Sequence, residues 1–151
     1  MPPLESLASQ EAVRASLGAV DWRTIQDRER PRPAGAPQYR DTWVEVRDYR
    51  FLGHAAVLRL HFYNDRLWDT RLYPMNQRAA LASLQQQGLQ LRRHNAGHLL
   101  ARPTENVMVT AHSDGWGDYI SWIDTRLLGQ SDDWYRAFGE NDLQEGRAAQ
   151  Q

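Results

Sequence analysis

The sequence predicts an α+β fold made of two units, each a helix followed by antiparallel strands. Residues 9–18 and 76–88 are rich in helix-forming residues, and both segments end at a glycine. Each of them precedes several short stretches with the composition and alternation of β-strands. In addition, residues 62–67 are echoed sixty residues later by 122–127: aromatic, apolar, Asn or Asp, one polar residue, then Arg-Leu. A repeated sequence pattern of this kind indicates a repeated structural unit.

These observations predict a single domain over residues 1–151 that contains two pseudo-repeat units, 9–73 and 75–138. The strands of both units are expected to form one sheet, with the helices packed on one face. A chain of 151 residues buries enough surface to fold without disulfides or metal. The polar tail over 141–151 is expected to be frayed.

The first unit begins with a capped helix over 9–18. Ser9 is a suitable N-cap, and Gly18 is suitable for the residue that follows the last turn. The proline-rich segment 27–37 is predicted to be a surface loop. Strands are predicted over 43–49, 55–63 and 66–73, joined by short turns into a meander. Alternation in the first of them places Trp43, Glu45, Arg47 and Tyr49 on one face, and alternation in the third places Trp68, Thr70 and Leu72 on one face.

The second unit begins with the clearest helix of the chain, over 76–88, with Asn76 as its cap. Two hairpins follow, the first around the turn at 95–97 and the second around 113–117. Their strands are predicted over 89–93 and 98–101, and over 107–111 and 118–123. A short helix near 131–138, with Ser131 as its cap, is expected to close the domain.

The composition excludes several chemistries. All eighteen basic residues are arginine, so a Schiff-base lysine and a P-loop lysine are absent. The sequence has no cysteine, which excludes thiol nucleophiles, disulfides and cysteine metal sites. The net charge of −1 gives no global field that would favour nucleic acid.

No stretch of the chain approaches the length of a membrane span, so a spanning segment is not expected. The N-terminus lacks the basic and apolar regions of a signal peptide. Two locations therefore stay open: the cytoplasm, or the periplasm and cell envelope if an export signal or a lipid-anchored segment has been removed.

The first part of the chain resembles a known architecture. A helical segment that ends in Leu17-Gly18, followed by strands that lead into His-Phe-Tyr-Asn-Asp-Arg-Leu over 61–67, resembles small bacterial envelope proteins of the BamE and β-lactamase-inhibitor-protein type. Arg66 stands where the pattern of those proteins has glycine. The inhibitor protein is a tandem repeat of such helix-and-strand units, which the internal echo matches. The resemblance implies a role in binding or assembly without catalysis.

The two echoed Asp/Arg pairs allow two interpretations. Asp65 with Arg66, and Asp124 with Arg126, could form a repeated recognition site, or each could fasten the end of a strand through turn hydrogen bonds. The second interpretation is favoured because a leucine follows each arginine. An alternative function, a small-ligand-binding protein or an enzyme, would use a polar pocket between the units lined by His61, Asp65, Asp124 and Arg126.

Other polar residues give weaker signals. His94 and His98 flank a turn and are the candidate metal ligands, but a zinc site needs at least one more ligand and none is placed nearby. No cofactor or metal is therefore predicted. His112, Ser113 and Asp114 are neighbours on a turn, whereas the groups of a catalytic triad converge from different directions.

The aromatic residues give the best indication of function. Tryptophan and tyrosine, together with arginine, dominate the energetically important positions of protein interfaces. Trp116 lies in a glycine-rich turn, where burial in the core is difficult. The predicted partner surface consists of Trp43, Arg47, Tyr49, Trp116 and Tyr119. The predicted function is a non-catalytic protein-binding, assembly or inhibitor-like module of a bacterium, with another protein as its partner.

Overall fold

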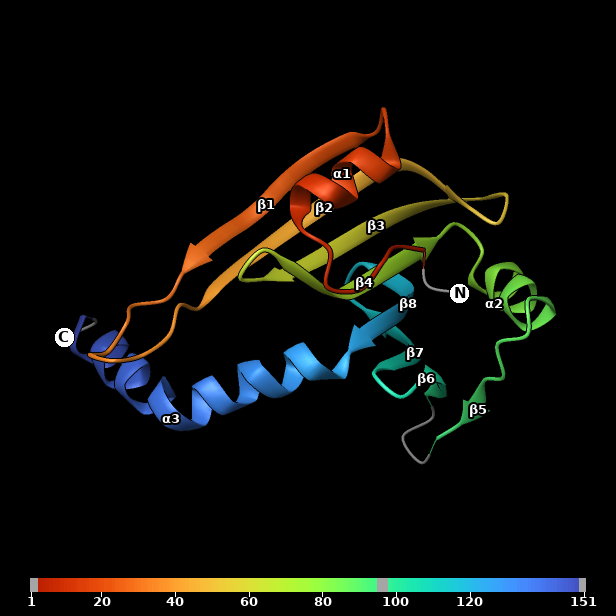
Figure 1. Ribbon diagram of the computed structural model, residues 1–151. Coiled ribbons are helices and arrows are strands. Elements are labelled where there is room, and N and C mark those ends of the chain that lie inside the picture. Colours follow the sequence, from red (N-terminus) through yellow and green to blue (C-terminus); the bar gives the residue numbers. More distant parts are fainter. Residues whose placement is uncertain (1–2, 95–97, 150–151) are drawn as a thin grey trace.

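The computed structural model describes residues 3–94 and 98–149, with side chains described as far as residue 139. The fold is α+β with one antiparallel sheet, as the sequence predicts (Figure 1). The sheet has eight strands, one more than the seven predicted. In chain order the elements are α1 (Gln10–Leu17), β1 (Asp21–Glu29), β2 (Arg40–Phe51), β3 (His54–Tyr63), β4 (Arg66–Pro74), α2 (Gln77–Gln86), β5 (Arg92–Arg93), β6 (Leu99–Thr104), β7 (Val107–Asp114), β8 (Gly117–Asp124) and α3 (Thr125–Ala149).

The sheet consists of two four-stranded meanders that meet at their last strands. Its strand order is β1-β2-β3-β4-β8-β7-β6-β5, so β4 and β8 lie side by side at the centre. The pairing of β4 with β8 extends over four residue pairs, from Asp69 opposite Ile123 to Leu72 opposite Ile120. We call this pairing the seam. Each meander is preceded by one helix, so the order of elements in the first half recurs in the second.

One face of the sheet carries the main apolar core. Alternate residues of β2, β3, β4 and β8 point to this face and are almost completely buried. They include Val44, Val46, Leu58, Leu60, Phe62, Leu72, Ile120 and Trp122. α1 contributes Val13 to this core, and α2 contributes Ala80 and Leu84. The two helices that precede the meanders therefore pack on the same face of the sheet.

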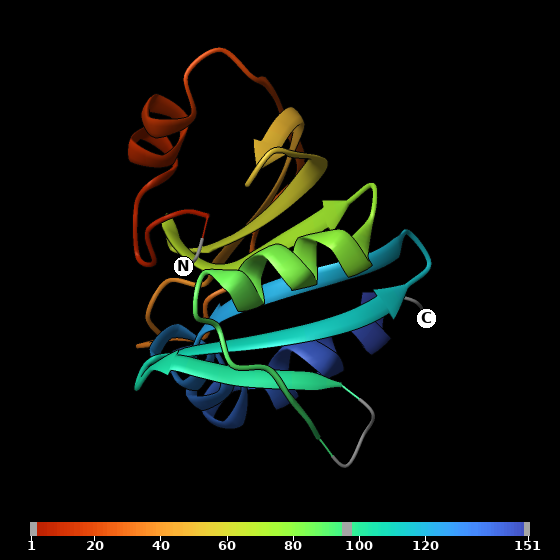
Figure 2. The ribbon, with the colours of Figure 1, turned by 90° about the vertical axis from the view of Figure 1, so that its right-hand side faces the viewer.

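The caps predicted for these two helices are confirmed. The Ser9 hydroxyl accepts a hydrogen bond from the backbone N–H of Ala12, and the Asn76 carboxamide accepts one from Ala79. Gly18 follows α1 with a φ of 70°, a left-handed conformation that glycine adopts without steric cost. Figure 2 shows α2 lying across β4 and β8, over the seam.

α3 leaves the end of β8 and runs to the connection between β1 and β2 (Figure 1). A second apolar cluster forms there from Tyr39, Tyr63, Leu127 and Trp134, with Trp68 and Phe138 packed against it. The indole N–H of Trp134 donates to the backbone carbonyl of Pro37 at 2.9 Å.

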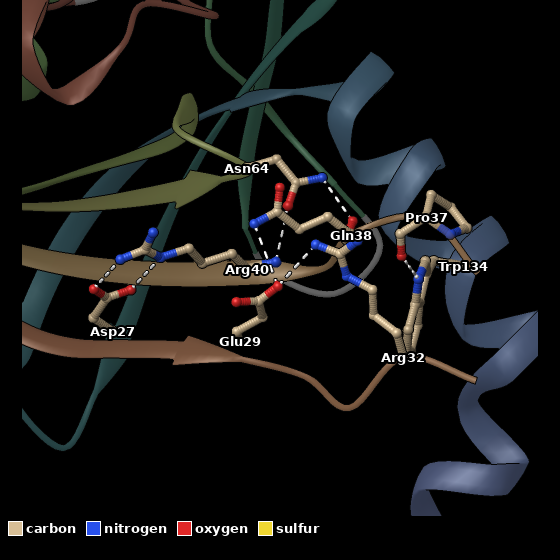
Figure 3. A network of polar contacts seen from close by, with 8 residues as sticks. All are labelled: Asp27, Glu29, Arg32, Pro37, Gln38, Arg40, Asn64 and Trp134. Carbon is tan, nitrogen blue, oxygen red and sulfur yellow. Dashed lines mark hydrogen bonds and ion pairs between the residues drawn. The ribbon is translucent and has the colours of Figure 1, made fainter. Parts of the chain in front are cut away.

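Polar contacts hold the same connection from the other side (Figure 3). The guanidinium of Arg40 donates to both oxygens of Asp27, at 2.8 and 2.5 Å. The Asn64 side chain accepts from the backbone N–H of Arg40 and donates to the carbonyl of Gln38. The proline-rich segment is thus fixed between α3 and the β3–β4 turn.

Three expectations about the elements are wrong. β1 begins at Asp21 and occupies residues that were expected to lie in or before a loop, because an edge strand that is mostly exposed lacks an apolar alternation. α3 extends to Ala149 through much of the tail expected to be frayed, and the Ser131 hydroxyl bonds the Tyr39 hydroxyl instead of capping a helix. The predicted turn at 95–97 lies outside the described residues.

The sequence echo does not mark equivalent positions. Residues 62–67 span the turn from β3 to β4, whereas residues 122–127 pass from β8 into α3. In the order of the elements, the counterpart of the β3–β4 turn is the β7–β8 turn. The repetition in this fold therefore lies in the order of helices and strands, and the six-residue pattern is unrelated to it.

In the described ranges, no helix combines the length and the apolar character that a membrane-spanning segment needs.

We expect Asp124→Ala to lower the free energy of unfolding by about 2–4 kcal/mol, measured by urea denaturation. Asp124 is 1% exposed, accepts from the Ser6 hydroxyl at 2.6 Å, and caps α3 by accepting from the backbone N–H of Arg126. Its loss also leaves the Ser6 hydroxyl without its partner. Asp132→Ala, an exposed position of α3, is the control and should change stability little. Equal losses in the two variants would contradict this role of Asp124.

Candidate functional site

The second face of the sheet is polar and aromatic. Side chains alternate between the two faces along a strand. In β2, β3, β4, β7 and β8, the residues between those of the apolar core therefore point to this second face. We call this surface the aromatic face. Its residues are Asp41, Trp43, Glu45, Arg47, Arg59, His61, Trp68, Asp69, Arg71, Tyr73, Thr110, His112, Tyr119 and Ser121, with His98 beside β6 and Trp116 in the β7–β8 turn.

A continuous stack of side chains crosses this face from one meander to the other. The His61 ring stacks on Trp43 with centroids 4.0 Å apart and an angle of 17° between the ring planes. The Arg71 guanidinium lies over Trp43 at 4.9 Å and over Tyr119 at 5.1 Å. The stack continues from Tyr119 to His112, whose ring lies 5.2 Å away. Since Trp43 and Tyr119 belong to different meanders, Arg71 bridges the seam.

Buried carboxylates hold two arginines of the aromatic face in place. Asp69 is 1% exposed and accepts from Arg71 Nε at 3.0 Å and from the Ser121 hydroxyl, across the seam, at 2.8 Å. Glu45 is 5% exposed and accepts from Arg47 Nε at 2.5 Å. Buried charges are tolerated when they are paired and hydrogen-bonded in this way. The result is a face whose guanidinium groups have fixed positions.

Trp116 extends the face at the end where the β7–β8 turn lies. Trp116 is 55% exposed, and the Arg59 guanidinium lies 3.4 Å from its ring centroid. Asp114 shapes this turn by accepting from the backbone N–H of Trp116 at 2.7 Å. The Tyr73 hydroxyl donates to Asp114, and burial together with this carboxylate raises the pKa of Tyr73 to about 12. Tyr73 therefore stays a hydrogen-bond donor at physiological pH.

Two histidines form a pair at the other end of the stack. The ring centroids of His98 and His112 lie 4.3 Å apart, and His98 Nδ1 donates to the carbonyl of Ala111. Burial lowers the pKa of His112, and the neighbouring His98 and Arg71 lower it further. Both effects disfavour the protonated ring of His112 in the folded protein.

Four of the five residues predicted for the partner surface lie on the aromatic face: Trp43, Arg47, Trp116 and Tyr119. Tyr49 does not. Asp48 adopts a φ of 58° within a β-bulge between Val46 and Tyr49, and this extra residue reverses the alternation. As a result Tyr49 lies opposite Ala56 and packs against the apolar core, so its predicted place beside Trp43 is wrong.

The four residues of the alternative pocket are directed to different places. His61 Nε2 bonds Asp41 on the aromatic face, at 2.9 Å. Asp65 accepts from the backbone N–H of Gln10 and so supports the start of α1. Asp124 and Arg126 bond each other through two nitrogen atoms, at 3.1 and 2.7 Å. The aspartates act as turn and cap residues, which matches the structural interpretation of the two Asp/Arg pairs.

The candidate metal ligands do not converge. The His98 ring contacts His112, whereas the hydrogen bond that joins His94 to His98 is between backbone atoms. Among the residues with described positions, no three His, Cys, Asp or Glu side chains gather as metal ligands would. The turn residues with triad chemistry are also apart, since Ser113 bonds Asp118 while Asp114 bonds Tyr73.

Several residues of the aromatic face were not among the predicted ones, chiefly Arg59, Asp69 and Arg71. The sequence contained a signal for their place on this face, because these residues alternate with leucine and threonine along β3 and β4. Trp68 was expected on the same face as Thr70 and Leu72. A bulge between β3 and β4 instead brings its ring to 4.7 Å from His61.

Comparisons with protein-family models, with curated proteins and with solved structures find no match to this chain.

We expect the protein to lose stability as the pH falls below 6.5, the ordinary pKa of histidine, because unfolded chains then bind a proton that folded His112 resists. The contribution of His112 to the free energy of unfolding is fully present above pH 6.5. It decreases as the pH falls towards the lowered pKa that His112 has in the folded protein. His112→Gln should flatten the dependence of the melting temperature on pH between about pH 7.5 and 5. The exposed His94→Gln is the control. An unchanged slope in His112→Gln would contradict the assignment.

Proposed function

We propose that this protein binds another protein through the aromatic face, without catalysis. The observation that carries the proposal is the stack of Trp43, Arg71 and Tyr119 on the side of the sheet opposite α1 and α2, extended by the exposed Arg47 and Trp116. Tyr119 itself is buried, and α3 packs beside Trp68 at one end of this face. Trp, Tyr and Arg are the residue types that dominate interface energetics. The Arg47 side chain is 49% exposed and that of Arg71 is 29% exposed, so solvent reaches the face along β2 and β4.

The rigidity of the face favours binding. Each immobilised side chain normally costs an interface some conformational entropy. Here the rings already pack on one another, and Glu45 and Asp69 hold the arginines before any partner arrives. Tryptophan and tyrosine offer large contact areas with few rotatable bonds. The side chains of the aromatic face are therefore already held in place before a partner binds.

The alternative function, an enzyme or small-ligand binder, has less support. It requires His61, Asp65, Asp124 and Arg126 to line one pocket, and their hydrogen bonds direct them to separate positions. The carboxylates of the aromatic face are engaged by arginine, histidine or tyrosine. Groups paired in this way suit a fixed recognition surface better than proton transfer.

The resemblance to tandem-repeat inhibitor proteins supports the same proposal. Those proteins are expected to consist of two helix-and-strand units, and this chain has one helix before each of two meanders. An inhibitor-like or assembly role in a bacterium agrees with that arrangement. Such a role needs an exposed surface and no catalytic group.

We expect Trp116→Ala to weaken capture of the partner while the melting temperature changes little. The side chain is largely exposed, and its main contact, the Arg59 cation–π pair, stabilises the fold by about 1 kcal/mol or less. The immobilised protein would be used to capture binding proteins from an extract of its source cells, identified by mass spectrometry. A protein retained by the wild type and by Arg78→Ala on α2, and lost with Trp116→Ala, supports the proposal.

Two results would count against it. Equal capture by the wild type and by both Trp116→Ala and Trp43→Ala would remove the aromatic face from the interaction. A large fall in the melting temperature of Trp116→Ala would show that this residue belongs to the core.

A further inference from the structure

We infer that the partner presents carboxylate groups, as an acidic segment of its chain, to the arginines of the aromatic face. This inference rests on the proposed function and adds the chemical character of the partner. It follows from the difference in solvent exposure between the arginine side chains and the acidic side chains of this face.

The acidic groups of the face lie beneath its arginines. The Glu45 side chain is 6% exposed, while its partners Arg47 and Arg59 are 49% and 20% exposed. The Asp69 side chain is 2% exposed beneath Arg71, which is 29% exposed. Asp41, bonded to His61, is 17% exposed. Over β2, β3 and β4 an approaching molecule therefore meets the guanidinium groups of Arg47, Arg59 and Arg71 before the carboxylates of Glu45 and Asp69. Asp114 is an exposed carboxylate at the β7–β8 turn, where the Tyr73 hydroxyl and the backbone N–H of Trp116 occupy its oxygen atoms.

Arg47, Arg59 and Arg71 have N–H groups that the acidic side chains beneath them do not use. A guanidinium has five N–H groups, and the acids below engage only part of them. Arg59 lies 3.6 Å from Glu45, which is longer than a hydrogen bond. Its Nε is buried and out of reach of an approaching group, so a contact with a partner would use the terminal nitrogens of this side chain, which is 20% exposed. Carboxylate oxygens accept from such donors, often in pairs, and guanidinium groups held flat against rings are well oriented for this contact.

A carboxylate partner fits this face better than single-stranded nucleic acid, which would also bring negative charge. Nucleic-acid bases need free ring faces for stacking. Trp43 already carries the His61 ring and the Arg71 guanidinium, and Tyr119 lies between Arg71 and His112.

The probe for this inference is a hexapeptide of glutamate, capped at both ends, added to the whole protein at low salt. Binding is followed through the NMR signals of the arginine Nε–H and tryptophan indole N–H groups. We expect shifts confined to the aromatic face, and a dissociation constant that rises with salt. Arg47→Gln and Arg59→Gln should each weaken binding about three- to tenfold. Arg78→Gln removes the same charge from α2 and should leave binding unchanged.

Controls separate the sources of negative charge. The inference is overturned if inorganic sulfate at equal ionic strength produces the same shifts, if the glutamine hexapeptide binds equally well, or if both variants bind as the wild type does. Tighter binding of an eight-residue oligothymidine would assign the face to nucleic acid instead. If the glutamate peptide fails while Trp116-dependent capture of a protein persists, only the acidic character of the partner is wrong. Failure of both overturns the proposed function as well.

Discussion

The arrangement of the whole molecule depends on the seam, the four-residue pairing of β4 with β8. Without it no strand of the first meander would pair with a strand of the second. Backbone hydrogen bonds form only part of the seam, because the buried Asp69 carboxylate also accepts from Ser121 on the opposite strand. The same carboxylate holds Arg71, which lies over rings from both halves. One acidic residue thus links the joining of the two halves to the construction of the surface.

The two faces of the sheet are stabilised in different ways. On one face, leucine, isoleucine and valine side chains are removed from water by α1 and α2, which is the usual source of folding free energy. On the other face, charged and aromatic groups satisfy one another. The burial of Glu45 and Asp69 costs solvation free energy that their arginine partners offset. The contacts on the aromatic face restrict the conformations of its side chains, because rings and guanidinium groups that contact several neighbours have few alternative rotamers.

The sequence predicted the fold class because its signals are local. Caps such as Ser9 and Asn76, and the alternation along β2, β3 and β4, depend on neighbouring residues only. β1 was missed because an exposed edge strand of mixed charge has no apolar period. Tyr49 and Trp68 were assigned to the wrong faces because one extra residue in a strand reverses the alternation, and the bulges at these positions carry no clear sequence signal. The stack itself joins residues from five strands, which local patterns cannot bring together.

The separation of the paired residues along the chain has a consequence for how the protein folds and opens. Within each meander, neighbouring strands follow one another closely, whereas the strands of the seam are about 50 residues apart. Because closing a long loop costs more entropy than closing a short one, we expect the hairpins to form before the seam. The Trp43–Arg71–Tyr119 contact would then form together with the seam. Native-state hydrogen exchange should find the backbone amides of this central pairing less protected than a position in the middle of a sheet would suggest. The surface that we assign to recognition would then be the first to lose its order when the two halves separate.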